Sequence, residues 1–534
     1  MNKVVKLLQQ YISDGQLEKA LLECKKLVQA GPNEIYPLKL LAHIFFLQEE
    51  YLAAINTTLK VLENRADDFD GHNNLGSYYL KLEEFEKALF YIEKAKQINP
   101  DHPAPHQNHC ETLMKMRDFK GSVKHIDKCI SRHETYSDDY LTYKSAIVIR
   151  IEIYIALKEQ SEAIKFIKKY LSIKFDAELL LQLVQIDTTE ASDEMINICK
   201  HKTQNKTFGS KIERYQEQVP LYFSLAYFYE KTDPPTSDNY FIKANNEVSE
   251  IQRITMIKFQ RYVLRNIENY EIIKNFDAKD KKKGKDNIFI LGMPRSGTTL
   301  TESIITANSE VFGGGELMSF YELTYGYLID EKYDTINSEM VGDQYIKRTE
   351  FLLSRHKKIA DKLPTNYSFL GHIRKFLPGA KIVLVLRDPW DLAVSLYKQR
   401  YVTNIPFSSS FFNLGVQMAN FEACILYWKK MGILDENVMI LNYEKLVKNF
   451  DEYQGKLYSF CEISSKYEPE KREGFFAKTA SINQVQNKIH TESLKKNNFA
   501  DLRPEFQEAF YSQREFWKSK DIGEIPNDFF GYSV

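Results

Sequence analysis

The sequence lacks the marks of several protein classes. Its six cysteines include no CxxC pair, and tryptophan occurs only three times in 534 residues. Without clustered cysteines, neither a disulfide-stapled secreted domain nor a zinc site is expected, and we interpret the cysteines as buried thiols in a reducing compartment. No uncharged apolar run approaches the ~18 residues of a membrane-spanning helix. The N-terminal stretch carries Asp14 and Glu18, unlike a signal or transit peptide. We therefore expect no membrane span and a cytoplasmic location.

Net charge is also nearly absent, because 72 Lys and Arg residues oppose 73 Asp and Glu residues. This balance removes the bulk electrostatic attraction on which binding to nucleic acids and anionic membranes depends, so we expect neither as the main partner. Any anion-binding site must be local. The hydrophobic content of 43% and the charged content of 27% are those of a folded globular chain. At roughly 150 residues per domain, the length predicts more than one domain.

A repeat occupies the first half of the chain. Small side chains recur every 34 residues at two interlocked positions: Ala20, Ala54, Ala88 and Ser122, and Ala42, Gly76 and Cys110. Paired antiparallel helices need small residues where they approach closely, and this pattern resembles the tetratricopeptide repeat (TPR). The resemblance implies an all-helical solenoid over residues 1–276. Its concave surface would bind a protein or peptide, although a plain scaffold would carry the same pattern.

The composition changes after the repeat. Residues 277–287 read DAKDKKKGKDN, which predicts a charged, solvated linker, with a basic nucleic-acid patch as the alternative. The following run, IFIL at 288–291, is short, wholly apolar and typical of a buried parallel strand. The next apolar segment, LTESIITAN, has helical spacing. We expect residues 288–534 to form a doubly wound α/β domain with a parallel sheet.

The loop between this strand and this helix reads GMPRSGTT at 292–299. A glycine-bearing loop before a helix N-terminus presents backbone N–H groups and the helix dipole to an anion. The Lys of the nucleotide triphosphatase loop GxxxxGK[ST] is replaced by Thr298. The sequence instead resembles the 5′-phosphosulfate loop of sulfotransferases, which use 3′-phosphoadenylyl sulfate (PAPS). The resemblance implies that the donor is bound by Pro294, Arg295, Ser296, Gly297, Thr298 and Thr299.

A second apolar strand, IVLVL, leads into Arg387, and Ser395 follows eight residues later in a helical segment. This spacing allows a guanidinium and a hydroxyl to converge on one phosphate. The sulfotransferase resemblance makes this the 3′-phosphate of PAPS, with Arg400 as a third donor. A structural arginine beside a Walker-B-like Asp388 in a P-loop kinase is the alternative.

Two later segments also match the family. The segment LNYEKLV contains Tyr443, which the resemblance places against the nucleotide. The segment KTASINQV resembles the stretch of tyrosylprotein sulfotransferases and their bacterial repeat-bearing relatives that returns to the active site. This resemblance implies a catalytic role for Ser481 and nucleotide binding by Lys496.

Sulfuryl transfer to a hydroxyl needs a base and cations that neutralise charge on the leaving oxygen. Neither nucleotide loop contains a histidine, but GGGEL at 313–317 offers Glu316, and its glycines allow a close approach to the donor. Tyrosylprotein sulfotransferases have a matching glycine-glutamate whose glutamate is the base. Arg295 and Lys362 match the cations of that family. A helix-capping glutamate and a solvated lysine are the alternatives for Glu316 and Lys362.

The chain is identified as a member of the TPR-containing bacterial sulfotransferases, with a catalytic half similar to tyrosylprotein sulfotransferases. The resemblance implies metal-free transfer of a sulfuryl group from PAPS to a hydroxyl acceptor, and the TPR array favours a protein or peptide acceptor. A P-loop kinase and a non-catalytic TPR adaptor with a degenerate α/β half are the alternative functions. No residue distinguishes tyrosine, a glycan or a small phenol as the acceptor.

Overall fold

The computed structural model of the protein describes residues 2–13, 16–136, 140–204, 208, 211–276, 278–329, 338–353, 356–401, 405–464, 466–473, 498–520 and 522–532. Contacts divide the chain into two compact units, Met1–Ile153 and Tyr154–Val534. Every helix among the described residues is too short or too polar to span a lipid bilayer.

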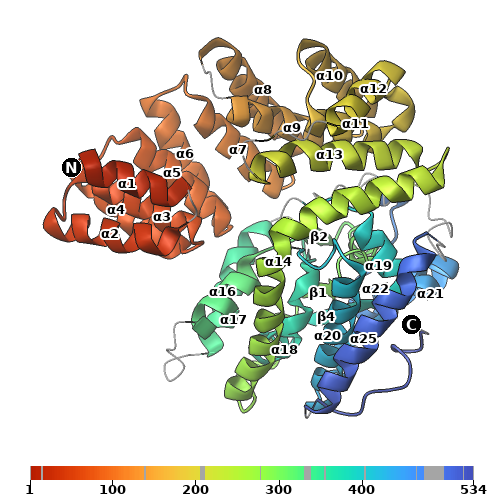
Figure 1. The fold of residues 1–534 in the computed structure, drawn as a ribbon. Coiled ribbons are helices and arrows are strands. Elements are labelled where there is room, and N and C mark those ends of the chain that lie inside the picture. Colours follow the sequence, from red (N-terminus) through yellow and green to blue (C-terminus); the bar gives the residue numbers. More distant parts are fainter. Residues whose placement is uncertain are drawn as a thin grey trace. The chain divides into compact units, whose positions relative to one another are not determined.

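The first unit is a stack of helical hairpins (Figure 1). Its helices are α1 (Asn2–Ser13), α2 (Leu17–Ala30), α3 (Ile35–Leu47), α4 (Tyr51–Asn64), α5 (Phe69–Lys81), α6 (Phe85–Ile98), α7 (Pro103–Lys115) and α8 (Phe119–Tyr136). The hairpin turns repeat the same backbone geometry, since Glu49, Glu83 and Arg117 all have left-handed φ angles and lie 34 residues apart. A Cβ atom on Gly76 would lie 2.5 Å from Ile92 Cγ1, so this close helix contact requires glycine. These features confirm the predicted TPR-like array.

The helices after α9 (Tyr140–Ala156) belong to the second unit. They are α10 (Gln160–Ile173), α11 (Ala177–Ile186), α12 (Asp193–Thr203), α13 (Lys211–Tyr229) and α14 (Pro234–Ile273). The hydroxyl of Tyr227 donates to the carbonyl of Lys398 at 2.7 Å, and Asn245 Nδ2 donates to the carbonyl of Tyr397 at 2.9 Å. Such bonds tie the helices to the α/β half. The compact unit that contains the sheet therefore begins at Tyr154, and the domain bounds expected from the sequence, 1–276 and 288–534, stay a prediction.

A five-stranded parallel sheet forms the centre of the second unit (Figure 1). Its strands are β1 (Asn287–Gly292), β2 (Val311–Gly315), β3 (Lys358–Asp361), β4 (Lys381–Leu386) and β5 (Val438–Asn442), in the order β2-β3-β1-β4-β5. All paired strands run parallel. This arrangement confirms the predicted parallel-sheet α/β half.

The sheet is buried on both faces, and alternate strand residues point to different cores. Ile288 and Ile290 pack with the core that includes α15 (Thr298–Ile305) and α22 (Phe450–Phe460). Phe289 and Leu291 pack with a larger core that includes, among other elements, α14 and three helices of the α/β half. Those helices are α18 (Leu370–Phe376), α20 (Phe411–Lys430) and α25 (Arg503–Lys518). Burial on both faces explains why these strands are continuous apolar runs in the sequence.

Most charged residues of the segment before β1 are exposed, but Lys283 is packed against the protein. Lys283 pairs with Asp343 at 2.8 Å and with Glu339, both on α17 (Ser338–Glu350), and its side chain is 10% exposed. The carbonyl of Lys283 accepts a hydrogen bond from Gly379 N at 2.8 Å. Lys283 is thus an exception to the exposure of its charged neighbours, because its stem lies along the protein while its ammonium group reaches carboxylates.

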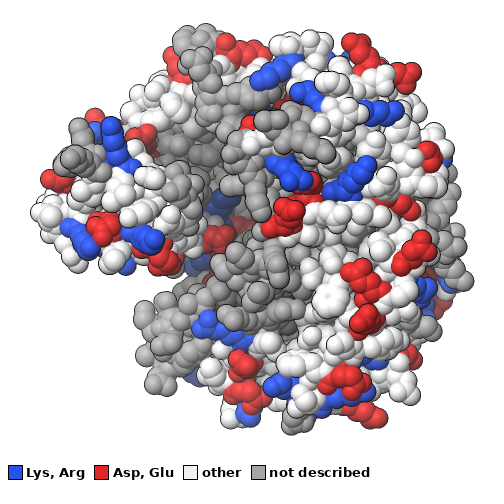
Figure 2. Space-filling view, in the orientation of Figure 1, with Lys and Arg blue, Asp and Glu red and all other residues white. Residues whose placement is uncertain are grey.

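Charges of both signs are interspersed at the surface. On the face drawn in Figure 2, Lys and Arg side chains lie among Asp and Glu side chains. No extended basic patch forms there among the coloured, described residues. This local pattern matches the even charge balance of the sequence.

The division near Ile153 predicts which fragments fold. We expect residues 154–534 to unfold in one cooperative transition, because this fragment keeps α14 packed on the sheet domain. A fragment of residues 277–534 should aggregate or lack a cooperative transition, because it exposes the surface that buries Phe241 and Tyr270. Circular dichroism melts and size-exclusion chromatography measure both properties. Equal, cooperative melting of the two fragments would contradict the unit boundary.

Candidate active site

The predicted site residues gather at one edge of the sheet. Because the strands are parallel, their carboxyl ends meet at this edge. Glu316 follows β2, Lys362 follows β3, the loop 293–297 follows β1, Arg387 follows β4 and Tyr443 follows β5. The chain passes to opposite sides of β1 on its way to β2 and to β4, and such switch points are where open α/β sheets bind ligands.

The loop after β1 is shaped around two glycines with positive φ angles, 150° at Gly292 and 107° at Gly297. A Cβ atom would lie 2.6 Å from the carbonyl oxygen of Val385 at Gly292, and 2.4 Å from the Tyr443 ring at Gly297. Ser296 is 1% exposed, and its Oγ has no hydrogen-bond partner among the described residues. An unsatisfied buried hydroxyl in a loop that leads into α15 fits an anionic ligand.

Direct hydrogen bonds join this loop to the segment after β4. Arg295 Nε donates to Ser395 Oγ at 3.2 Å, and Ser395 lies on α19 (Pro389–Tyr397). Arg387 Nη1 donates to the carbonyl of Arg295 at 2.9 Å. The Arg387 guanidinium carbon also lies 4.7 Å from the ring centroid of Tyr443. The two segments that were predicted to bind opposite ends of one nucleotide therefore lie side by side.

Two tyrosines that no sequence motif indicated lie near Arg295. Burial lowers the pKa of Arg295, and the positive charge of Arg387 lowers this pKa further. The nearby Tyr401 raises it in part. Burial raises the pKa of Tyr227, on α13, to about 12. It also raises the pKa of Tyr401, whose buried hydroxyl has no hydrogen-bond partner within the described part of the chain. Both phenols therefore stay protonated near neutral pH.

Glu316 and Lys362 form an ion pair. Lys362 Nζ lies 2.6 Å from Glu316 Oε1, and the lysine side chain is 0% exposed whereas that of Glu316 is 42% exposed. Lys362 is therefore not the solvated surface lysine that was the alternative. Burying an ammonium group is costly unless it is paired, so Lys362 depends on this carboxylate in the structure shown.

Glu302 is a site residue that the sequence analysis did not identify. This buried residue of α15 accepts a hydrogen bond through Oε1 from Gly315 N, at 2.9 Å. The carbonyl of Gly315 accepts one from Lys362 N at 2.8 Å. Glu302 thus holds the backbone directly before Glu316. Its signal in the sequence is a carboxylate on a helix whose other side chains are apolar or small and polar.

Other predicted residues have different settings. Thr298 and Thr299 are buried at the start of α15, and Pro294 is partly buried in the preceding loop. Arg400 Nη1 lies 2.7 Å from a carboxylate oxygen of Glu178 on α11, so its assignment to the 3′-phosphate stays a prediction. Ser481 and Lys496 lie outside the described residues.

His372 is packed in the core among aromatic rings, including those of Tyr270, Phe369 and Trp428. Burial lowers its pKa to about 3. Within the residues that the structure describes, no group of three or more His, Cys, Asp or Glu side chains is arranged as a metal site.

Family models match both parts of the chain. Residues 287–468 match the sulfotransferase family, and residues 69–102 match the tetratricopeptide repeat. Residues 287–468 form a sulfotransferase domain. Two resemblances are thus confirmed: the one inferred from GMPRSGTT and the one inferred from the 34-residue period. Each rests on a local sequence pattern.

Two curated relatives match part of this chain. An uncharacterized protein of Aquifex aeolicus (strain VF5) is 27% identical over 372 residues, which cover 65% of this chain and 47% of that protein. The protein-tyrosine sulfotransferase of Drosophila melanogaster is 23% identical over 254 residues, 45% of this chain and 48% of that protein. The matched stretches span about half the length of these two relatives.

Solved structures resemble either part at low scores. A sulfotransferase domain from the curacin biosynthetic pathway is 18% identical with a TM-score of 0.26, and covers 45% of this chain and 98% of that chain. YrrB, a TPR protein, is also 18% identical with a TM-score of 0.26, and covers 33% of this chain and 87% of that chain.

The close contact between Gly297 and Tyr443 predicts the effect of a small substitution. Gly297→Ala should lower the free energy of unfolding by about 1–3 kcal/mol, because alanine is strained at this φ angle and its Cβ would collide with the ring. Urea denaturation measures this difference. Gly455→Ala is the control, because nothing lies within 4 Å of that position and alanine favours a helix by up to about 1 kcal/mol. Equal stabilities of the two variants would show that the loop is not constrained as described.

Proposed function

We propose that the sulfotransferase domain transfers a sulfuryl group from PAPS to a hydroxyl group of a protein or peptide, without a metal ion. The observation that carries this proposal is the direct linkage of the two anion-binding segments: Arg387 Nη1 to the carbonyl of Arg295 at 2.9 Å, and Arg295 Nε to Ser395 Oγ at 3.2 Å. A nucleotide that carries phosphate groups at both its 5′ and 3′ positions suits two adjacent anion sites.

Each segment would bind one end of the donor. The N–H groups of the loop and the hydroxyl groups of Ser296, Thr298 and Thr299 would hold the 5′-phosphosulfate, where the dipole of α15 also favours negative charge. Arg387 and Ser395 would hold the 3′-phosphate, because a guanidinium can form two parallel hydrogen bonds with phosphate oxygens. The ring of Tyr443 would lie against the nucleotide.

The remaining residues suit in-line transfer. Glu316 would accept the proton of the acceptor hydroxyl as the acceptor oxygen bonds to sulfur. The bond from sulfur to the bridging oxygen breaks, and this oxygen keeps the electron pair as part of the phosphate of 3′-phosphoadenosine 5′-phosphate (PAP). Arg295 and Lys362 would neutralise its growing charge. Protonation of Glu316 removes the carboxylate charge that pairs with Lys362, so the ammonium group becomes available when the leaving oxygen needs it.

Two features favour a macromolecular acceptor. The Glu316 side chain is partly exposed, so an acceptor can reach the proposed base from solvent. The TPR unit adds a repeat surface of the kind that commonly binds peptides. The Drosophila melanogaster relative is a protein-tyrosine sulfotransferase, and we extend this acceptor class to the present chain. All six cysteines are free and buried, which suits a cytoplasmic enzyme.

Titration with PAP tests the nucleotide assignment. Calorimetry should show that Arg387→Ala weakens PAP binding by about tenfold or more, because charge-assisted hydrogen bonds to the 3′-phosphate are lost. Binding of adenosine 5′-phosphate, which lacks that phosphate, should change little. Arg374→Ala is the control, since Arg374 pairs with Asp435 at the opposite edge of the sheet.

Three outcomes would overturn the assignment. Equal PAP affinity in the wild type and Arg387→Ala would remove the 3′-phosphate site. Tight ATP binding that requires Mg²⁺ and disappears with a chelator would indicate a kinase. If no nucleotide binds to the wild type, the adaptor function would be favoured instead.

A second variant tests the base. Glu316→Gln should bind PAP as the wild type does but lose turnover by about 10²-fold or more, because an amide cannot accept the proton. Product formation from radiolabelled PAPS measures turnover, and a melting curve checks that buried Lys362 remains accommodated. Glu310→Gln, a change directly before β2, is the control. Unchanged turnover in Glu316→Gln would require another base.

The role of the TPR unit can be tested with the fragment 154–534. If the repeats bind the acceptor, their removal should lower kcat/KM for a long tyrosine-containing peptide and leave kcat/KM for phenol unchanged. PAP affinity should also stay unchanged, because every proposed nucleotide contact in the described residues lies within the fragment. Equal loss for both acceptors, or no loss for either, would contradict acceptor binding by the repeats.

A further inference from the structure

One hydroxyl group contacts both sequence neighbours of Tyr443. Asn442 Nδ2 donates a hydrogen bond to the Tyr532 hydroxyl, which itself donates to Glu444 Oε2. The other oxygen of Glu444 accepts from Asp388 N at 3.0 Å. Asp388 directly follows Arg387 in the sequence. The Tyr532 hydroxyl is thus connected, through the Glu444 carboxylate, to the backbone next to Arg387, the residue proposed to bind the 3′-phosphate.

Tyr443, between the two tethered residues, touches both nucleotide segments. Its ring lies beneath the Arg387 guanidinium, 4.7 Å from ring centroid to Cζ. The same ring fills the space where Gly297 would carry a Cβ atom. A shift of the Tyr443 backbone would therefore disturb the phosphate loop and the arginine together.

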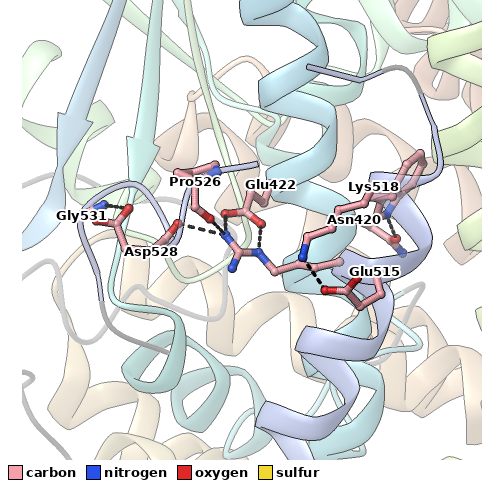
Figure 3. A network of polar contacts seen from close by, with 9 residues as sticks. Asn420, Glu422, Glu515, Lys518, Pro526, Asp528 and Gly531 are labelled. Carbon is pink, nitrogen blue, oxygen red and sulfur yellow. Dashed lines mark hydrogen bonds and ion pairs between the residues drawn. The ribbon is translucent and has the colours of Figure 1, made fainter. Parts of the chain in front are cut away.

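The segment that carries Tyr532 is itself firmly held (Figure 3). Arg514, on α25, donates to the carbonyl groups of Pro526 and Asp528 at 2.6 and 3.0 Å. Its guanidinium also makes two bonds to Glu422 of α20, at 2.6 and 2.8 Å. Both charged side chains are buried. A buried charge is costly unless it is paired, so each residue needs the other to keep its position.

The last turn of the segment presents the Tyr532 hydroxyl in a defined direction. Phe529 and Tyr532 exchange backbone hydrogen bonds at 2.9 and 3.0 Å. Gly531 has a φ angle of 90°, and its N–H donates to Asp528 Oδ1 at 3.0 Å. Phe529 is buried against Phe510 and Phe421, which lie on the two helices that the Arg514 pair joins.

The electrostatic setting keeps the tyrosine protonated. Burial raises the pKa of Tyr532, and hydrogen bonding to the Glu444 carboxylate and its negative charge raise it further. The phenol therefore remains a hydrogen-bond donor to Glu444 over the working pH range of an enzyme near neutrality.

We propose that residues 522–532 are a strap that positions the nucleotide site, with Tyr532 as a positioning residue for binding of the PAPS donor. This inference rests on the proposed function, because it assigns Arg387 and Tyr443 to the nucleotide. Without the Tyr532 hydroxyl, Asn442 and Glu444 lose their shared partner, and Tyr443 and Arg387 are held less firmly. Donor binding is therefore weakened, whereas Glu316 and Lys362, which follow strands on the far side of β1 from β4 and β5, keep their arrangement.

Tyr532→Phe in the full chain tests the strap. PAP binding should weaken by about tenfold, the typical effect of losing a hydrogen bond to a charged group. KM for PAPS should rise in parallel, while kcat and KM for the acceptor stay near the wild-type values. Tyr511→Phe is the matched control, because it makes the same change on α25 at a tyrosine that is 45% exposed.

A double variant separates positioning from general destabilisation. Glu444→Gln should weaken PAP binding by itself, but should cause little further loss when combined with Tyr532→Phe, since both changes break one chain of contacts. Additive losses would overturn the strap. A wild-type-like PAP affinity in Tyr532→Phe would do so as well, whether or not the melting temperature falls. If the wild-type chain itself does not bind PAP, the proposed function fails before the strap is tested.

Discussion

The pairing of β1 with β4 is the constraint on which the site depends. Their register sets Gly292 opposite Val385, so that the glycine loop after β1 and Arg387 after β4 emerge next to each other. The contacts from Arg387 to the carbonyl of Arg295, and from Arg295 to Ser395, follow from this register. A slip of one residue would point Arg387 to the other face of the sheet, and the two segments would no longer meet.

Two cations of the site, Lys362 and Arg387, contact protein groups that could give way to substrate groups during a reaction. Lys362 is paired with Glu316, and Arg387 is stacked on Tyr443. Both arrangements satisfy a charge that would otherwise be buried without compensation. In the proposed reaction, proton transfer to Glu316 and the arrival of phosphate groups would change these partners without a large movement of the backbone.

The support of this edge extends well beyond the strands. Helices α11 and α13 contact the turn after α19 through Glu178 and Tyr227, and α20 and α25 hold the strap through Glu422 and Arg514. Helices α11 and α13 were expected to belong to the repeat array. Their polar contacts show why the second unit starts near Tyr154 instead of at the first strand.

Features that depend on contiguous residues or on a fixed period could be predicted from the sequence. These are the 34-residue repeat, the apolar strands, the glycine-bearing loop 292–299 and the residues at the strand ends, all of which depend on local spacing. Which distant groups meet is set by the packing of the folded chain. Tyr532 and Glu444 are 88 residues apart, and Arg400 and Glu178 are 222 apart. A single polar side chain that pairs over such a separation leaves no periodic signal, because its partner is chosen by how the helices pack on the sheet.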